Sequence, residues 1–283
     1  MPSVHERRFT RAFAACSAMA VLAGTTTMMT STIGPGLWLR NPSAWIVTAL
    51  ACAGLVRLSA LPRWLPSILP VLLALSFAGP GQAGVHRWLG LGPVQINAAA
   101  LVLPLALALA FQAARPRRQV AAVMIAMIGL LAWQPDMSQL AALSAALVAG
   151  ATVRRDLRTL AWIVPLASAA LFVCAHRPDP LAAVPYVEGI LHMAWNVSPL
   201  LALAAGGCLL LTALSPLILA ADADRRPAAA ALAAYFVVSG AAWLFGVFPV
   251  PLAGYGLSFV LGWGLGAAAL LVNRPAAPAL ADT

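Results

Sequence analysis

Charged side chains are scarce in this sequence. Aspartate, glutamate and arginine together make up 9% of the 283 residues, and lysine is absent, whereas about 25% of the residues in an average soluble domain are charged. The sequence contains no Walker A motif, no dinucleotide-binding fingerprint and no Ser-His-Asp arrangement, and no polar stretch is long enough to form a soluble domain around one. These absences argue against ATP-dependent or nicotinamide-dependent chemistry.

Cysteine is also rare, and its spacing gives no signal for a metal centre. Cys16, Cys52, Cys174 and Cys208 each lie inside an apolar run, without a C-x-x-C pair or a Cys/His pattern. Free cysteines of this kind behave as small apolar residues. The four cysteines are therefore predicted to be core residues without a disulfide or a metal ion.

Apolar residues make up 62% of the chain, and the mean hydropathy is +0.91. A lipid-exposed backbone must satisfy its hydrogen bonds internally, and long runs of Ala and Leu without strand alternation can do so only as helices. We therefore predict an all-α polytopic membrane protein, with one transmembrane domain over residues 1–274 and a disordered tail over 275–283. The predicted spans cover residues 12–34, 43–61, 64–80, 94–114, 118–133, 137–153, 157–175, 188–215, 228–248 and 252–272.

The arginines are distributed unevenly between the predicted loops. When successive loops are assigned alternately to two sides of a membrane, fourteen of the 17 arginines fall on one side, and only Arg40, Arg87 and Arg177 fall on the other. Because cytoplasmic loops of membrane proteins are rich in arginine and lysine, both termini are predicted to be cytoplasmic. This asymmetry explains the net charge of +9 without a nucleic-acid partner.

Three segments on the arginine-poor side form an ordered set of motifs. Residues 87–92 read R-W-L-G-L-G, residues 134–136 read Q-P-D, and residues 249–259 read P-V-P-L-A-G-Y-G-L-S-F. In order and spacing they resemble the R-W-I-x-L-G, Q-P-D and P-L-P-F-I-S-Y-G-G-S-S segments of the SEDS family of cell-wall polymerases, the FtsW, RodA and SpoVE group. The resemblance covers essentially the whole chain and implies a multi-pass protein of the bacterial cytoplasmic membrane.

The chain departs from the family at several motif positions. Where the family continues its first motif into Q-P-S-E and a lysine, residues 97–100 carry no charge and Leu103 stands at the lysine position. Ser138 and Gln139 replace a glycine and a threonine after the second motif. The outer loop between helices seven and eight, which holds much of the active site in the family, is shortened here to residues 176–187. The sequence is therefore consistent with a protein that retains catalysis and with one that has lost it.

The resemblance implies a candidate catalytic carboxylate. The family has an essential aspartate at the outer mouth of helix eight, thought to deprotonate or position the attacking sugar hydroxyl, and Glu188 stands at the corresponding place. The extra methylene of Glu188 changes its reach by more than a positioned base tolerates. An alternative is that Glu188 only stabilises the N-terminus of helix eight through the helix dipole. Asp179 is a second candidate, although Asp-Pro is typical of a turn.

Four further residues on the arginine-poor side are candidates for substrate binding. A guanidinium group binds phosphate oxygens through two parallel hydrogen bonds, so Arg87 and Arg177 are candidates for holding the diphosphate of a polyprenyl-linked sugar. Asp136 and Tyr255 come from the second and third motifs. The alternative for each of these residues is ordinary contact with lipid headgroups or solvent.

No metal site is predicted. His192 follows Glu188 by four residues, so the two side chains could share a helix face, and His176 is the only further ligand nearby. A structural or catalytic metal needs more ligands at suitable spacing. The sequence indicates no cofactor, and it carries no signal for a divalent cation on the diphosphate.

Three functions remain for comparison with the structure. The first is a glycosyltransferase that joins lipid II-type disaccharide units at the outer leaflet. The second is a catalytically degenerate relative that binds a lipid-linked precursor or a partner, such as a single-span transpeptidase or a division protein. The third is a transporter, which lacks support because neither a repeat nor paired intramembrane charges occur. The expected partners are membrane lipid, the polyprenyl-diphosphate-linked sugar and that single-span protein.

Overall fold

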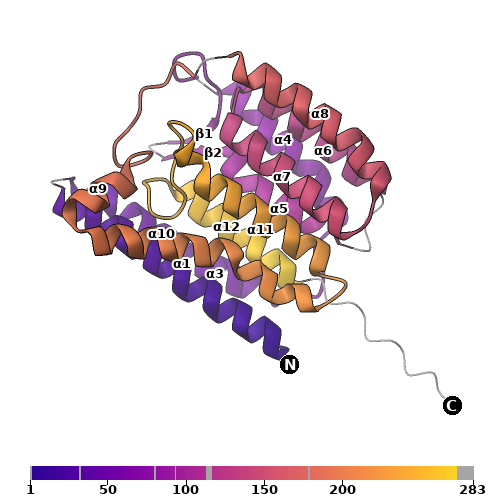
Figure 1. The fold of residues 1–283 in the computed structure, drawn as a ribbon, viewed down its shortest axis with the longest axis horizontal. Coiled ribbons are helices and arrows are strands. Elements are labelled where there is room, and N and C mark those ends of the chain that lie inside the picture. The colour runs from indigo at the N-terminus through magenta and orange to yellow at the C-terminus, as the bar shows by residue number, and fades with distance from the viewer. Residues whose placement is uncertain are drawn as a thin grey trace.

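The computed structural model describes residues 2–31, 33–79, 81–92, 94–112, 117–177 and 179–272, which form a helical bundle with one small hairpin (Figure 1). Helical structure occurs in each of the ten predicted segments. The predicted tail over 275–283 lies outside the described residues. The elements are α1 (Val4–Thr30), α2 (Pro35–Trp38), α3 (Arg40–Leu55), α4 (Leu65–Ala74), η1 (Leu75–Ala78), β1 (Trp88–Leu91), β2 (Val94–Asn97), α5 (Ala98–Ala110), α6 (Arg117–Trp133), α7 (Met137–Val153), α8 (Leu157–Ala175), α9 (Ile190–Val197), α10 (Pro199–Leu214), η2 (Ser215–Ala221), α11 (Arg226–Ala241), η3 (Ala242–Leu244) and α12 (Leu257–Val272).

The helices differ in their ability to cross a membrane. Four helical segments are long and apolar enough by length and composition, namely Val4–Thr30, Leu157–Ala175, Pro199–Ala221 and Arg226–Leu244. Shorter apolar helical segments cover Leu65–Ala78, Ala98–Ala110, Met137–Val153 and Leu257–Val272. The predominantly helical fold is therefore confirmed, whereas ten crossings and cytoplasmic termini stay predictions.

Four helices form the centre of the bundle. Helices α5, α7, α11 and α12 lie between a group containing α1, α3 and α10 and a group containing α4, α6 and α8 (Figure 1). Helix α11 packs along α7, and α12 packs along α5 and α3. Trp263 and Phe236 are fully buried at this centre, and their rings stack with centroids 4.1 Å apart.

The close contact between α5 and α12 depends on a glycine. A Cβ atom built at Gly262 would lie 1.9 Å from the carbonyl oxygen of Ala100. Small residues allow helix backbones to approach closely when surrounding lipid supplies no hydrophobic driving force for association. Gly262 therefore fixes the distance between these two central helices.

The predicted span over residues 94–114 is wrong at its start. Val94–Asn97 is a strand, β2, that pairs antiparallel with Trp88–Leu91, and α5 begins only at Ala98. Asn97 caps this helix because its side-chain oxygen accepts a hydrogen bond from the Ala100 N–H over 2.9 Å. The first motif therefore forms β1 of a hairpin, and β2 of that hairpin leads into α5, which periodicity alone did not reveal.

The predicted span over residues 188–215 is not one continuous helix. Helix α9 begins at Ile190 and ends at Val197, and α10 begins at Pro199. Ser198 between them is extended, with φ −163° and ψ 127°, because the proline ring disfavours helical geometry in the residue before it. The tenth segment also starts later than predicted, at Leu257 instead of residue 252.

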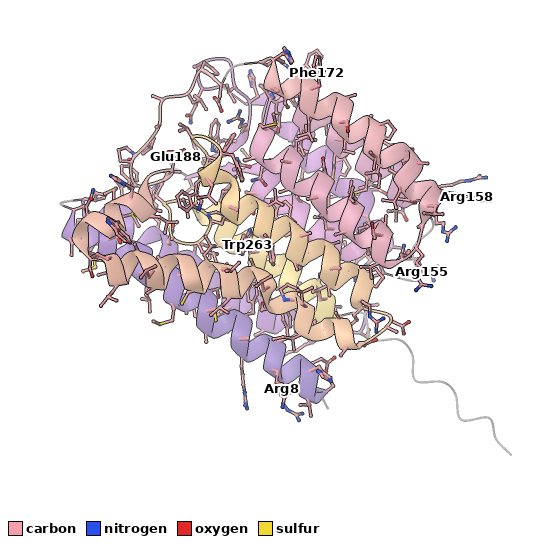
Figure 2. All side chains as sticks on the ribbon, in the orientation of Figure 1. Arg8, Arg155, Arg158, Phe172, Glu188 and Trp263 are labelled. Carbon is pink, nitrogen blue, oxygen red and sulfur yellow. The ribbon has the colours of Figure 1, made fainter. Side chains whose placement is uncertain are left out.

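The connections between helices gather at two opposite ends of the bundle. At one end, the Arg225 guanidinium contacts the Glu6 carboxylate over 2.8 Å, and Arg154 donates to the Phe111 carbonyl oxygen. Figure 2 shows Arg8, Arg155 and Arg158 toward the lower and right edges, away from Phe172 and Glu188. We call the end with Arg8, Arg155 and Arg158 the arginine-rich end. We call the opposite end the motif end, because the three sequence motifs meet there.

Candidate functional site

Arg87 lies at the centre of the polar contacts at the motif end. Its guanidinium donates to Asp179 Oδ2 over 2.6 Å and to the Pro135 carbonyl oxygen over 2.6 Å. Its Nε atom lies 3.9 Å from Asp136 Oδ2. The structure thus brings the first and second motifs and the loop before α9 together around one arginine. Two carboxylates already balance the charge of Arg87, which weakens its candidacy as a free diphosphate ligand.

Asp136 links this cluster to the buried bundle. Its side chain is the N-cap of α7, because Oδ1 accepts hydrogen bonds from the Gln139 N–H over 3.3 Å and from the Ser138 hydroxyl over 3.2 Å. The Gln139 side-chain oxygen in turn accepts a hydrogen bond from the hydroxyl of Tyr235 in α11. Asp136 is only 4% exposed. Its capping and ion-pair contacts make it a structural organiser of the site.

Arg177 is exposed and occupies a different position. Its Nη1 donates to the carbonyl oxygens of Ala132 over 3.2 Å and Trp133 over 3.0 Å, at the C-terminus of α6. Because terminal helix carbonyls carry partial negative charge, they attract a guanidinium group. In contrast to Arg87, Arg177 has no ion pair with a carboxylate of the described residues. It is therefore the better of the two anion candidates.

The third motif is a folded loop held by a buried asparagine. Asn41 is fully buried, and its amide nitrogen donates to the carbonyl oxygens of Leu252 over 3.1 Å and Gly254 over 2.7 Å. Its side-chain oxygen accepts from the Gly256 N–H over 3.1 Å. A Cβ atom at Gly254 would lie 2.4 Å from the Val187 carbonyl oxygen. The loop thus depends on Asn41 and on the small size of Gly254.

Tyr255 presents its ring from this loop to two partners. The Arg40 guanidinium donates to the Tyr255 hydroxyl, and its central carbon lies 5.6 Å from the ring centroid. The Tyr186 ring meets the Tyr255 ring edge to face, with centroids 5.8 Å apart. Arg40, one of the three arginines of the arginine-poor side, therefore takes part in the site through Tyr255.

Glu188 lies in a turn that docks on the third-motif loop. The Tyr255 N–H donates to the Tyr186 carbonyl over 2.8 Å, and the Val250 N–H donates to the Val187 carbonyl over 3.1 Å. The half-buried Glu188 carboxylate accepts a hydrogen bond from the Val184 N–H over 2.8 Å. It directly precedes Gly189, the N-cap residue of α9. The Glu188 turn, the third-motif loop and the Arg40–Tyr255 pair therefore form one unit.

The surroundings of Glu188 change its acidity. Burial raises the pKa of this carboxyl above its ordinary value, and the nearby Asp179 charge adds to the increase, while backbone N–H groups act in the opposite direction. A carboxylate with a raised pKa is a stronger base at neutral pH. This environment suits a general base better than an ordinary solvated carboxylate would.

The two histidines considered for a metal site do not meet Glu188 in a ligand cluster. His192 lines an apolar pocket with Trp195 and Trp243, and the His176 ring lies tilted against the Phe172 ring with centroids 4.2 Å apart. Among the described residues, no group of three or more His, Cys, Asp or Glu side chains could hold a metal ion.

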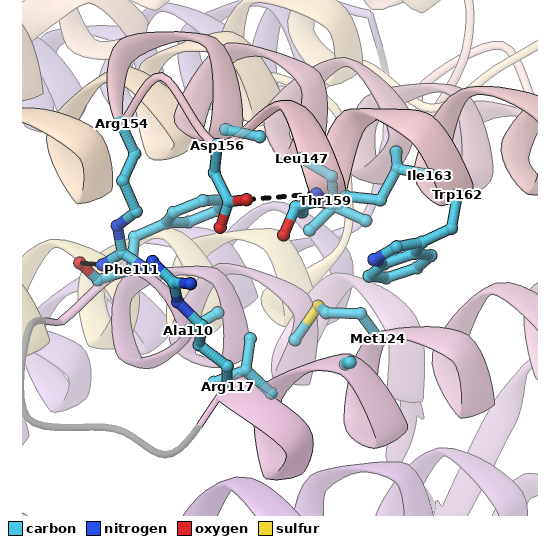
Figure 3. Close-up of a pocket in the computed structure, with 13 residues that line it drawn as sticks. Ala110, Phe111, Arg117, Met124, Leu147, Arg154, Asp156, Thr159, Trp162 and Ile163 are labelled. Carbon is cyan, nitrogen blue, oxygen red and sulfur yellow. Dashed lines mark hydrogen bonds between the residues drawn. The ribbon is translucent and has the colours of Figure 1, made fainter.

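A small pocket at the arginine-rich end has too little space for a substrate. The Arg154 guanidinium covers the Phe111 ring at 5.4 Å, and Asp156 accepts a hydrogen bond from the Thr159 N–H (Figure 3). The pocket encloses ≈ 40 Å³, which is the space of about one water molecule. The Arg154 contacts hold the α7–α8 turn against Phe111 at the C-terminal end of α5.

Sequence reasoning missed three residues that organise the motif end. Asn41 was not singled out, although an asparagine inside an apolar run is a signal for a buried hydrogen-bond partner. Ser258 accepts a hydrogen bond at its Oγ from the Asn97 N–H over 2.8 Å and joins β2 to α12. Ser76 accepts from the Gln134 side chain over 2.5 Å. Such partners come from distant parts of the chain, so no local pattern identifies them.

The comparisons with known proteins give a likeness of fold. No protein-family model and no curated protein matches the chain. The structure is similar to the crystal structure of an aspartate-to-alanine mutant of the Rod shape determining protein RodA from Thermus thermophilus, with 19% identity and a TM-score of 0.60 over 93% of this chain and 96% of that chain. The chain has the RodA fold.

Two more solved structures agree with this assignment. RodA from Thermus thermophilus without the mutation matches with 19% identity and a TM-score of 0.58, over 93% of this chain and 95% of that chain. A chain from a peptidoglycan synthase complex, solved to describe the coordination of polymerization and crosslinking, matches with 23% identity and a TM-score of 0.59, over 92% and 96%. The SEDS resemblance indicated by the three motifs is thus confirmed at the level of the fold.

Proposed function

We propose that this membrane protein acts in bacterial cell-wall synthesis, in division or shape maintenance, and polymerises lipid II-type disaccharide units at the outer leaflet of the cytoplasmic membrane. The observation that supports this most is the RodA fold over 93% of the chain, with a half-buried carboxylate, Glu188, in the turn that docks on the third motif. Under this proposal the motif end faces outward.

The proposed reaction transfers a glycosyl group between two lipid-linked molecules. Glu188 takes the proton from the attacking sugar hydroxyl, whose oxygen forms a bond to the anomeric carbon of the donor sugar. The bond from that carbon to the diphosphate breaks, and its electron pair leaves with the polyprenyl diphosphate. Arg177 offers charge-assisted hydrogen bonds to that leaving group, and Tyr255 with Arg40 borders the acceptor side.

One observation favours the second reading, a degenerate relative that binds the precursor without polymerising it. Arg87 is engaged by Asp179, by the Pro135 carbonyl and, more loosely, by Asp136, so the arginine of the first motif is not free for a diphosphate.

We also propose a single-span transpeptidase partner, since one solved structure with this fold belongs to a complex that couples polymerization to crosslinking.

The test is polymerisation of fluorescent lipid II by purified protein, with and without a candidate transpeptidase. Glu188→Gln removes the basic oxygen and keeps the shape, so the rate should fall by about 100-fold or more, which is the usual contribution of a general base. Asp224→Asn, the same change on an exposed loop at the opposite end, should leave the rate unchanged. Equal rates for wild type and Glu188→Gln, or no product from folded wild type, would favour the degenerate reading.

A further inference from the structure

An apolar groove lies between α1, α3 and α12, which pack side by side (Figure 1). It encloses ≈ 340 Å³, within the range of ligand pockets in proteins, about 300–1,000 Å³. Its lining residues recur at helical spacing from Phe9 to Ser17 in α1, from Trp45 to Val56 along α3 and from Val260 to Leu271 in α12. The α12 residues are mostly buried, whereas Thr10 and Ala53 are exposed. The groove therefore has α12 as its floor and opens to the surroundings between α1 and α3.

The groove is about as long as one leaflet of a membrane. From Trp45 to Val56, α3 rises by about 16 Å at 1.5 Å per residue, and α12 rises by the same amount from Val260 to Leu271. The hydrocarbon core of a bilayer is about 30 Å thick, so the groove covers about half of it. This length matches a single acyl chain, whereas the transmembrane helix of a partner would cross the whole core.

A hydrogen bond across the groove marks the end that is nearer to the motif end. The Trp45 indole Nε1 donates to the Ser17 hydroxyl over 2.9 Å. Both residues lie on the motif-end side of the lining, because α3 begins at the motif end and α1 begins at the arginine-rich end. The groove is bridged at this pair, and its other end, at Phe9 and Val56, reaches the arginine-rich end.

The hydroxyl and indole donors in the groove are already used. The hydroxyl groups of Thr10, Ser17 and Thr48 each donate to a carbonyl oxygen of their own helix, and the Trp45 N–H is used on Ser17. Apart from these side chains and the weakly polar Cys52 thiol, the lining is apolar. The groove thus offers little to a polar ligand, whereas each methylene group that it takes out of water stabilises a bound hydrocarbon chain.

Arginines without acidic partners lie at the arginine-rich end of the groove. Arg57 directly follows the last lining residue of α3, and Arg7 precedes the lining residue Thr10 by one helical turn. Both arginines are exposed, and neither forms an ion pair with a carboxylate of the described residues. Glu6 is the only acidic residue of α1, α3 and α12, and it pairs with Arg225. This end of the groove therefore attracts an anionic headgroup.

We infer that the groove binds a phospholipid with an anionic headgroup, such as phosphatidylglycerol, from the leaflet at the arginine-rich end. One acyl chain lies along α3 and α12 as far as Trp45, and Arg57 and Arg7 donate charge-assisted hydrogen bonds to the headgroup. The inference does not depend on the proposed polymerisation, which takes place at the motif end. A polyprenyl-linked substrate would enter from the other leaflet, where Trp45 and Ser17 bridge the groove.

The test is a titration of the delipidated full chain, followed by native mass spectrometry. Phosphatidylglycerol and phosphatidylcholine with the same acyl chains are the two probes. Wild type should bind the first phosphatidylglycerol with a Kd at least fivefold lower than that of phosphatidylcholine. Arg57→Gln should raise the Kd of phosphatidylglycerol by about fivefold, the usual contribution of one arginine near an anionic lipid surface. Ala53→Trp fills the groove from its rim and should raise the Kd of both lipids.

Matched variants control for changes outside the groove. Arg158→Gln removes an exposed arginine at the start of α8, and Ala51→Trp adds the same ring on an exposed part of α3 that does not line the groove. Neither should change either Kd.

Three results would overturn the inference. The first is an equal Kd of the two lipids for wild type. The second is an unchanged Kd of phosphatidylglycerol in Arg57→Gln or in folded Ala53→Trp, and Arg57→Gln alone decides if Ala53→Trp does not fold. The third is displacement of phosphatidylglycerol by an equal concentration of polyprenyl phosphate, because the groove would then hold the tail of a substrate.

Discussion

At the scale of single residues, the contacts at the motif end distinguish residues that hold the fold together from residues that could bind or act on a substrate. Asn41 and Asp136 are nearly or fully buried, and their side-chain polar atoms form hydrogen bonds with backbone groups. Glu188 and Arg177 are more accessible and have capacity left for a ligand. The motif letters alone do not separate these roles, because a carboxylate that caps a helix and one that takes a proton look alike in a sequence.

The role of Asn41 predicts a measurable loss of stability. Asn41→Ala removes three hydrogen bonds and leaves the Leu252 and Gly254 carbonyls and the Gly256 N–H without this partner. The free energy of unfolding should fall by about 2–4 kcal/mol, since unsatisfied buried groups cost about 1–3 kcal/mol each and partial rearrangement recovers some of it. Unfolding by a denaturing detergent measures this. Asn196→Ala, at an exposed position, should change it by less than about 0.5 kcal/mol.

At the scale of elements, the close contact between α5 and α12 predicts that a small increase in side-chain size destabilises the protein. Gly262→Ala would force Cβ to within 1.9 Å of the Ala100 carbonyl oxygen, so the helices must separate and the free energy of unfolding should fall by about 1–3 kcal/mol. Gly206→Ala adds the same methyl group in α10, where no heavy atom would lie within 4 Å of the added Cβ, and should be neutral or stabilising. Equal thermal midpoints for the two variants would contradict this packing.

The N-cap residue of α8, Asp156, predicts that the free energy of unfolding depends on pH. Burial opposes ionisation of Asp156, but hydrogen bonds from Thr159 and the charges of Arg117 and Arg154 outweigh it, so the pKa is lowered from its ordinary value. The cap therefore contributes stability above about pH 4, the ordinary Asp value, and loses it as the pH falls through the lowered pKa. Asp156→Ala should lower the free energy of unfolding by about 1 kcal/mol near pH 7.

The pH series checks that assignment. The stability difference between wild type and Asp156→Ala should narrow as the pH falls below about 4, because protonation removes the ionised cap from wild type. A difference that stays constant from pH 7 to the acid limit of folding would show that Asp156 acts without its charge.

At the scale of the whole molecule, the segregation of arginines predicts the orientation in the membrane. In a variant whose four native cysteines are replaced, Ala182→Cys in the loop before α9 should react with an impermeant maleimide in intact cells. Arg158→Cys, at the start of α8, should react only after the membrane is opened, because arginine-rich loops face the cytoplasm. Both positions are exposed. The reverse labelling pattern would invert the topology and exclude an outward-facing motif end.

The sequence by itself determined the helical class, the approximate position of each apolar segment and the separation of arginines between two ends. These features follow from composition and from the order of apolar and charged residues, since a backbone in lipid must form its own hydrogen bonds. The resemblance in three motifs also indicated the fold that the RodA structures share with this chain. The β1–β2 hairpin and the break at Ser198 were missed, because apolar runs continue through both places. Strand pairing at the first place and the proline after Ser198 at the second interrupt the helix that the apolar run predicts.

Only the tertiary structure decided which side chains meet. Arg87 faces Asp179 across 92 positions of the chain, and Asn41 binds a loop more than 200 positions away. It also showed that Arg87 is neutralised by carboxylates while Arg177 has no such ion pair among the described residues, and that α1, α3 and α12 border one apolar groove. Such pairings depend on how helices pack against one another, and packing is decided by shapes and hydrogen-bond partners that lie far apart in the sequence.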